Sequence, residues 1–286
     1  MGTAKNYSNQ TTPTWCPGCG DFSILRSIQA AAAHLDLAPH DLAVISGIGC
    51  SGRISGYLNA YGFHSIHGRA LPIAQGVKMA NPNLTVIATG GDGDGFAIGT
   101  AHTVHAMRRN MDITYILMNN QIYGLTKGHT SPLSETGFIT KSTPQGSVDA
   151  PLKPGLLALA SGASFIAQGF SGFQDQLIEI ILKAIHHKGF SFVNVFSPCV
   201  TFNKTNTYQW FRENLKNIDA LEDYDTKHFQ QAMNMYLETD GIFTGVLYEN
   251  IEKSPYPVPM GKKGLGLAKD NLNIGDTFDH LMKEFI

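Results

Sequence analysis

Four cysteines are the residues of this 286-residue sequence whose types and spacing most directly indicate chemistry. Cys16 and Cys19 form a C-x-x-C turn in TWCPGCGD, where two thiolates can converge on one metal centre. Cys50, in SGIGCSGR, and Cys199, in FSPC, each follow an apolar run that predicts a strand. Four sulfur ligands suit either an all-cysteine zinc site or a four-iron cluster. One close pair with two distant partners favours the cluster, and a redox pair with two buried cysteines is a third interpretation.

A glycine-rich turn, ATGGDGDGF, ends another predicted strand and begins a helix. With an Asn-Asn pair after the next strand, it resembles the G-D-G…N-N pattern of thiamine-dependent enzymes. Asp92 and Asn120 offer a carboxylate and an amide oxygen, which are ligands that Mg²⁺ prefers when it holds a diphosphate. The resemblance adds the Ile122 carbonyl as a third ligand. The glycines allow close approach of phosphate, and the missing G-x-G-x-x-G spacing argues against a nicotinamide site.

The elements that must position these residues follow from apolar periodicity. Buried parallel strands are predicted at 42–46, 84–89, 113–118, 164–167 and 190–197. Helices are predicted at 22–35, 71–80, 96–109 and 173–188. This alternation predicts an α/β fold with a doubly wound, mostly parallel sheet, and it places Cys50 and Cys199 at carboxyl ends of strands. The segment 119–147 has little periodicity, which predicts a long functional loop.

The pattern changes after residue 200, where polar helices near 207–218 and 226–238 precede a Pro/Gly/Lys-rich stretch at 253–266. We interpret 1–200 as the domain for thiamine diphosphate and the cluster, and 201–286 as a C-terminal extension that packs on the core or a partner subunit. Charged residues make up 15% of the chain and the net charge is −2, so neither nucleic acid nor a membrane surface is an expected partner. Without a long apolar segment, we expect a cytoplasmic protein.

Six motifs occur together in one order: WCPGCG, GIGCSGR, HGRALPIAQGVKMAN, GGDGDGFAIG, NNQIYGLTKGHTSP and SPC. Over about residues 7–200 the chain resembles the β subunit of 2-oxoacid:ferredoxin oxidoreductases, most of all the bacterial two-subunit 2-oxoglutarate type. The resemblance implies the thiamine-diphosphate-binding fold, with thiamine diphosphate, Mg²⁺ and a 4Fe-4S cluster as cofactors. It implies oxidative decarboxylation of a 2-oxoacid, with coenzyme A accepting the acyl group and ferredoxin accepting the electrons.

The same resemblance assigns residues to each cofactor. The cluster would be held by Cys16, Cys19, Cys50 and Cys199, and Mg²⁺ by Asp92, Asn120 and Ile122. Thiamine diphosphate would be lined by Ile48, Gly49, Cys50, Ser51, Ser65, Ile66, His67, Gly68, Gly93, Asp94, Gly124 and Leu125. In this family the glutamate beside the aminopyrimidine comes from the α subunit. The chain is therefore expected to form half of an active site, in an (αβ)₂ heterotetramer.

Arg53 and Leu125 are the candidates for the substrate pocket. A guanidinium at position 53 can pair with the distal carboxylate of 2-oxoglutarate, or it can balance the negative charge of the cluster. The alternatives for the whole chain are a pyruvate or broad-specificity subunit, a non-oxidative thiamine decarboxylase subunit and a zinc-stabilised assembly module.

Overall fold

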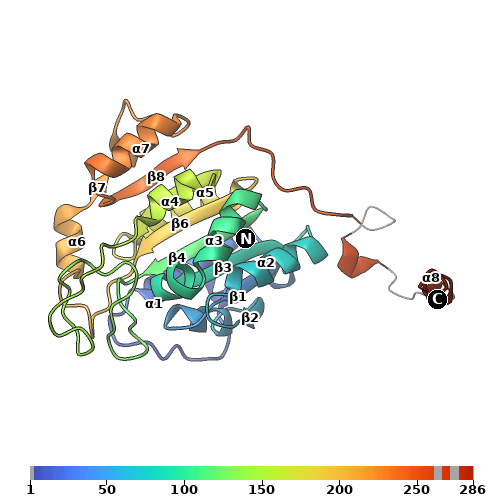
Figure 1. The fold of residues 1–286 in the computed structure, drawn as a ribbon, viewed down its shortest axis with the longest axis horizontal. Coiled ribbons are helices and arrows are strands. Elements are labelled where there is room, and N and C mark those ends of the chain that lie inside the picture. Colours follow the sequence, from blue (N-terminus) through green and yellow to red (C-terminus); the bar gives the residue numbers. More distant parts are fainter. Residues whose placement is uncertain (1–2, 261–265, 271–276, 286) are drawn as a thin grey trace.

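An eight-stranded sheet forms the centre of the protein in a computed structural model, which describes residues 3–260, 266–270 and 277–285. The strand order is β2-β1-β3-β4-β6-β5-β8-β7, and every pairing from β2 to β5 is parallel. Helices pack on both faces of this sheet (Figure 1). The predicted α/β fold with a mostly parallel sheet is confirmed.

Five strands lie where the apolar runs predict them. They are β1 (Leu42–Ser46), β3 (Thr85–Gly91), β4 (Ile113–Asn119), β5 (Phe165–Phe170) and β6 (Phe190–Phe196). Nearly all of their residues are buried, because helices cover both faces. The strand β2 (Tyr61–His64) is not predicted by the sequence, since all four of its residues are exposed at the edge of the sheet.

Two apolar cores form because alternate residues of each strand point to opposite faces. Tyr115 and Leu117 of β4 belong to one core, and Ile116 and Met118 to the other. The first core contains residues of α2 (Ala70–Ala80), α3 (Thr100–Arg109), α4 (Pro154–Ala160) and α7 (Phe229–Glu238). The second contains residues of α1 (Asp21–His34) and α5 (Gln174–His186).

The helix predicted at 96–109 is divided in two. Residues Asp94–Ile98 form one turn of π-helix, in which the Gly99 N–H donates to the Asp94 carbonyl oxygen at 3.1 Å. The α-helix α3 begins only at Thr100. Single π turns of this kind are frequent at functional sites, and this one directly follows the glycine-rich turn.

Residues after 200 join the same sheet. The strand β8 (Phe243–Glu249) pairs antiparallel with β5, and the two-residue β7 (Lys216–Asn217) pairs with β8. The predicted polar helices appear as α6 (Tyr208–Asn214) and α7, and the division of the chain at residue 200 stays a prediction. Of the Pro/Gly/Lys-rich stretch at 253–266, residues 261–265 lie outside the described residues.

The remaining elements are short. They are α8 (Thr277–Met282) and the 3-10 helices Ala4–Tyr7, Pro39–Asp41, Ser51–Gly56, Ile218–Ala220 and Leu267–Lys269. Among the described helices, none has the length and apolar character needed to cross a membrane.

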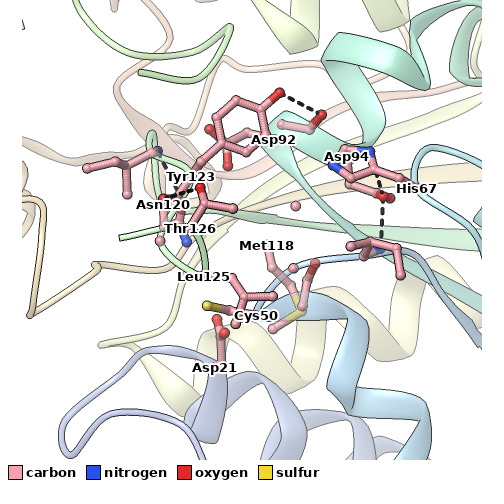
Figure 2. A pocket seen from close by; sticks show the side chains of 17 residues that line it. Asp21, Cys50, His67, Asp92, Asp94, Met118, Asn120, Tyr123, Leu125 and Thr126 are labelled. Carbon is pink, nitrogen blue, oxygen red and sulfur yellow. Dashed lines mark hydrogen bonds and ion pairs between the residues drawn. The ribbon is translucent and has the colours of Figure 1, made fainter. Parts of the chain in front are cut away.

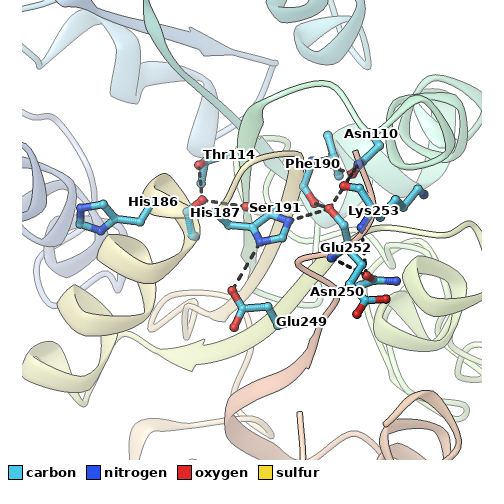
Figure 3. A network of polar contacts seen from close by, with 12 residues as sticks. Asn110, Thr114, His186, His187, Phe190, Ser191, Glu249, Asn250, Glu252 and Lys253 are labelled. Carbon is cyan, nitrogen blue, oxygen red and sulfur yellow. Dashed lines mark hydrogen bonds and ion pairs between the residues drawn. The ribbon is translucent and has the colours of Figure 1, made fainter. Parts of the chain in front are cut away.

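The strands β4, β5 and β6 begin at what we call the amino edge of the sheet, where the buried Asn110, Ser164 and His187 and the half-buried Glu249 form a polar network. Figure 3 shows Asn110, His187 and Glu249 of this network. The Asn110 Oδ1 atom accepts from the Ser164 hydroxyl at 2.5 Å, and Ser164 Oγ lies 2.7 Å from His187 Nε2. His187 Nδ1 lies 3.4 Å from the Glu249 carboxylate. This network joins the starts of three strands to the end of β8.

Candidate active site

The loops that follow β1, β3 and β4 enclose a cleft at the opposite edge, which we call the carboxyl edge. It contains about 510 Å³ of space not filled by protein atoms, part of it open to solvent. The cleft is lined by Asp21, Ile48, Gly49, Cys50, Ser51, His67, Gly91, Asp92, Gly93, Asp94, Met118, Asn120, Ile122, Tyr123, Gly124, Leu125 and Thr126. Figure 2 shows Asp21 and Cys50 at one end of this Asp92 cleft, with Asp92 and Tyr123 at the other.

Asp92 is fixed by hydrogen bonds at the end of β3. Its side chain is buried and accepts from the Ser131 hydroxyl and from the backbone N–H groups of Gly93 and Asn120. Burial raises the pKa of Asp92 to about 7, although these donors favour the carboxylate. A cation bound at this carboxylate would oppose the effect of burial.

Asn120 lies beside Asp92, as the sequence predicts. Its Oδ1 atom accepts from the Ile122 N–H at 3.1 Å. Gln121, between Asn120 and Ile122, has a left-handed backbone with a φ of 57°, which turns the chain sharply after β4. The structure thus brings the carboxylate, the amide oxygen and the backbone of Ile122 to one side of the cleft.

Asp94 connects two loops below the cleft. Its Oδ1 atom accepts from the backbone N–H groups of Ile48 at 2.8 Å and Gly68 at 2.7 Å. Gly68 has a φ of +72°, and an added Cβ would lie 2.6 Å from the Gly99 nitrogen, so no other residue fits this contact without strain. Burial raises the pKa of Asp94, while these N–H donors and nearby His67 lower it. Asp94 therefore positions the loops after β1 and β2.

Several polar atoms that face the cleft are buried without a hydrogen-bond partner in the described part of the chain. They include Asp21 Oδ2, Ser51 Oγ and His67 Nδ1, the last of which lies 3.5 Å from Asp94 Oδ1. Such atoms are rare in folded proteins and often await a ligand, ion or water. The cleft therefore suits a polar ligand.

All four cysteines line a second hollow, which we call the cysteine pocket. An added Cβ at Gly124 would lie 3.5 Å from Cys199 Sγ and 3.6 Å from Cys50 Sγ, so these two sulfurs face the same point. Burial raises the pKa of Cys19 above its usual range and that of Cys50 to about 12, with Asp21 adding to both increases. Both thiols are thus neutral unless a cation or iron binds them.

Within the described ranges, no three Cys, His, Asp or Glu side chains are close enough together to bind one metal ion. The two hollows share a wall, because Cys50, Asn120, Gly124 and Leu125 line both.

Comparisons with known proteins agree with this arrangement. Residues 47–195 match the family described as "Thiamine pyrophosphate enzyme, C-terminal TPP binding domain", and residues 199–262 match the family of the C-terminal part of the pyruvate ferredoxin oxidoreductase beta subunit. Over 267 residues the chain is 42% identical to 2-oxoacid:ferredoxin oxidoreductase 2, subunit beta, of Aeropyrum pernix, which covers 90% of this chain and 86% of that protein. The chain belongs to the family of 2-oxoacid:ferredoxin oxidoreductase β subunits.

Other members of this family are named for one substrate. The chain is 46% identical over 199 residues to the 2-oxoglutarate oxidoreductase subunit KorB of Mycobacterium tuberculosis, across 70% of this chain and 53% of that protein. It superimposes on a 2-oxoglutarate:ferredoxin oxidoreductase from Magnetococcus marinus, solved with 2-oxoglutarate, coenzyme A and succinyl-CoA bound. The TM-score is 0.87 at 38% identity, over 98% of this chain and 96% of that chain. The predicted family and oxidoreductase class are confirmed.

Most residues predicted for this β subunit's cofactor site meet in the Asp92 cleft, but three lie outside its wall. Gly68 lies behind the wall of the cleft, where its N–H donates to Asp94 Oδ1. Ser65 is buried, with its N–H on the Ser46 carbonyl, and Ile66 is 72% exposed. Arg53 lines the cysteine pocket, where its guanidinium donates to the Thr14 hydroxyl, and Leu125 lines both hollows.

Five further residues of this β subunit belong to the site without having been predicted. Asp21, Met118, Tyr123 and Thr126 line the cleft, and Ser131 binds Asp92. The Tyr123 hydroxyl donates to the Gly93 carbonyl at 3.2 Å, so the loop after β4 closes over the glycine-rich turn. Asp21 adjoins the motif WCPGCG and Tyr123 lies within NNQIYGLTKGHTSP, which is a signal that could have found them. Ser131 lies in the same motif as Tyr123, but nothing in the motif indicates its contact with Asp92, which only the folded loop creates.

Proposed function

We propose that this chain is the β subunit of a 2-oxoglutarate:ferredoxin oxidoreductase, which converts 2-oxoglutarate and coenzyme A to succinyl-CoA and carbon dioxide. In this proposal the Asp92 cleft holds thiamine diphosphate with Mg²⁺, and the cysteine pocket holds a 4Fe-4S cluster. The main support for the proposal is the wall that the two hollows share. It places the cysteines beside the cleft in which the 2-oxoacid would lose its carboxylate as carbon dioxide. Electrons would have only this wall to cross.

The cleft suits thiamine diphosphate in its donor groups. Ser51 Oγ and His67 Nδ1 are buried there without hydrogen-bond partners among the described residues, and Gly91 and Gly93 line the cleft with backbone alone, which phosphate oxygens can approach. When bound, this cofactor supplies the carbanion chemistry that decarboxylation of a 2-oxoacid requires. Of the described residues that line the cleft, none is a glutamate, which supports an α subunit as the source of that side chain.

The oxygen atoms around Asp92 suit Mg²⁺. Asp92 would provide the negative ligand and Asn120 the amide oxygen. In the described chain no N–H group donates to the Ile122 carbonyl, so that oxygen is available as a third ligand. Ser131 would orient the carboxylate through its hydroxyl.

The cysteine pocket suits a cluster better than a zinc ion. Zinc requires four sulfurs at about 2.3 Å from one point. The four cysteines instead line a hollow of about 710 Å³, part of it open to solvent. A cluster has its ligands at separate corners, and it would bring electrons to the protein surface, where Cys16 is exposed and ferredoxin could accept them.

The choice of 2-oxoglutarate rests on the Magnetococcus marinus structure, which aligns with 98% of this chain. The Aeropyrum pernix relative is named only for 2-oxoacids, so pyruvate and 2-oxobutyrate are the acids to compare. Leu125 would contact the substrate from the common wall, and Arg53 from the cysteine pocket. The assembly expected from the family resemblance is an (αβ)₂ heterotetramer.

The test is anaerobic purification of the chain with its α subunit, followed by analysis of iron, sulfide, zinc, magnesium and thiamine diphosphate. Four iron atoms and one thiamine diphosphate per chain, and ferredoxin reduction with 2-oxoglutarate and coenzyme A, are the expected results. Cys199→Ser should remove the visible absorption of the cluster, whereas Ser191→Ala, on the strand β6 that precedes Cys199, should keep it. Zinc in place of iron at full activity, or equal turnover with pyruvate, would contradict the proposal.

A further inference from the structure

We infer that Trp15 and Asp21, which flank the CPGC turn, are positioning residues that fix the other two cysteine segments relative to that turn. Trp15 binds the segment of Cys50, and Asp21 binds the segment of Cys199. The inference rests on the proposed function only in naming a cluster as the occupant. The Trp15–Cys50 and Asp21–Ser197 hydrogen bonds join residues of this chain and do not depend on a bound cluster.

The Trp15 contact joins the turn to the loop after β1. Its indole Nε1–H donates to the Cys50 carbonyl oxygen at 2.8 Å. The ring is 8% exposed and packs edge-on against Phe22 at 5.3 Å and Tyr57 at 4.9 Å between centroids. Because these neighbours hold the ring on two sides, its N–H has a fixed direction, and so does the backbone of Cys50.

The Asp21 contact joins the turn to the loop after β6. Asp21 is 1% exposed, and its Oδ1 atom accepts from the Ser197 hydroxyl at 2.7 Å. An added Cβ at Gly20 would lie 2.9 Å from Ser197 Cα, so the start of α1 is pressed directly on this loop. Asp21 lies two residues after Cys19, and Ser197 two residues before Cys199.

The same contacts continue to the Asp92 cleft. The Ser197 N–H donates to the Asn119 carbonyl at 2.8 Å, and the Asn203 side chain donates to the Asn120 carbonyl at 3.2 Å. Asp21 lines the cleft, and its second oxygen, Oδ2, is buried without a hydrogen-bond partner among the described residues. Asp21 thus ties the spacing of the cysteines to the wall of the cleft, as residues behind metal ligands commonly do.

Ser191 provides a matched control for Ser197. Both are fully buried serines at the two ends of β6, and each donates one hydrogen bond of 2.7 Å, Ser191 to the Ala184 carbonyl. Loss of either hydroxyl should weaken the fold, Ser197→Ala more than Ser191→Ala because the acceptor of Ser197 is a carboxylate. Only Ser197→Ala should affect the cysteines.

The first measurement is hydrogen exchange of the full chain, copurified with its partner subunit and stripped of iron by a chelator. Ser197→Ala and Asp21→Ala should each accelerate exchange in both 16–22 and 196–204, by about fivefold for a hydrogen bond of ordinary strength. Trp15→Phe should accelerate exchange at 48–53. Ser191→Ala and Trp210→Phe should leave these segments unchanged, and Asp21→Asn, which keeps the acceptor oxygen, should restore them.

The second measurement uses the iron-loaded complex. Ser197→Ala and Asp21→Ala should lose iron to a chelator about fivefold faster than Ser191→Ala and should broaden the electron paramagnetic resonance spectrum of the reduced cluster. Exchange in Ser197→Ala that matches Ser191→Ala, or that changes on one side of the hydrogen bond only, would overturn the inference. If the wild-type chain binds no iron, the proposed function fails, while the exchange measurement still decides whether the two residues position the cysteines.

Discussion

At the amino edge of the sheet, the buried polar side chains have partners within the chain. Asn110 uses both ends of its amide, accepting from Ser164 and the Phe190 N–H and donating to two carbonyls near Lys253. At the carboxyl edge, Ser51 Oγ and His67 Nδ1 are buried and have no hydrogen-bond partner among the described residues, although His67 Nδ1 lies 3.5 Å from Asp94 Oδ1. An unpartnered buried group costs about 1–3 kcal/mol. The comparison indicates that the amino edge stabilises the fold, whereas the carboxyl edge gives up stability that a bound ligand restores.

The sharpest test of this comparison removes one carboxylate from each edge. Asp92→Ala should weaken thiamine diphosphate binding in the presence of Mg²⁺ by about a thousandfold, or ~4 kcal/mol, because it removes the only anionic ligand proposed for the ion. Asp112→Ala, at the amino edge, breaks an ion pair with Lys78 of 3.0 Å and should leave cofactor affinity unchanged. Isothermal titration calorimetry measures both. Unchanged affinity in Asp92→Ala would mean that the ligand of this edge is not held through Asp92.

The converse test removes an amide from the amino edge. Asn110→Ala should lower the free energy of unfolding by about 3 kcal/mol, since it leaves the Phe190 N–H and the Ser164 hydroxyl buried without their acceptor. The left-handed φ of 55° at this position adds to the loss. Urea denaturation measures the change, with the exposed Asn83→Ala as control. Cofactor affinity should not change, and a loss of affinity as large as the loss of stability would break the division between the edges.

Within the carboxyl edge, substitution of Arg53 tests whether the cysteine pocket contributes to the choice of substrate. Arg53→Ala should raise the Michaelis constant for 2-oxoglutarate more than that for pyruvate, because a charge-assisted pair with the distal carboxylate is lost. The change in the ratio of the two constants should be equivalent to about 1.5–3 kcal/mol. Arg53→Lys keeps the charge without the planar fork and should recover only part of the effect. Steady-state kinetics of the assembled enzyme measure this. Equal increases for both acids would assign Arg53 to the charge of the cysteine pocket instead.

The smallest expected effect is the pH dependence of the amino edge. Burial lowers the pKa of His187, and the Glu249 carboxylate offsets this only in part. Because the unfolded chain binds this proton more readily below its ordinary pKa of about 6.5, stability should rise as the pH increases from about 5 to about 7. His187→Gln cannot titrate, so its unfolding free energy should rise with pH less steeply than that of the wild-type protein. The two slopes should differ by less than about 1.4 kcal/mol per pH unit. Identical slopes for the two proteins would show that His187 does not titrate in this range.

The sequence predicts the five strands with mostly apolar runs and misses β2 and β8. The runs ending at Ser46 and Phe196 are mostly apolar, so their burial could be inferred. β2 is short and exposed, whereas β8 is largely buried but contains Gly245 with a φ of +126°, which interrupts its strand pattern. The antiparallel pairing of β8 with β5 depends on contacts between distant segments, which no local pattern encodes.

The same limit applies to the site. Cys50, Asp92 and Asn120 could be predicted to meet because each follows a strand, and they do line adjoining hollows. Ser131 could not, since 39 residues separate it from Asp92 and the loop between 120 and 153 has no regular element to fix its path. Ser197 belongs to the SPC motif, but nothing in that motif indicates its contact with Asp21.

The direction of β8 decides where the chain leaves the sheet. Because β8 runs antiparallel to β5, it ends at the amino edge, where the Asn250 N–H donates to the Ser164 carbonyl at 2.7 Å. The next residues stay at this edge, where the Tyr256 N–H donates to the Asn110 carbonyl at 3.0 Å, and Figure 1 shows the chain beyond them extending to one side of the sheet. A linker attached beyond residue 250 therefore starts on the side opposite the Asp92 cleft. Tethering the protein to an electrode or a bead through that linker would turn the cleft and the cysteine pocket toward the solution.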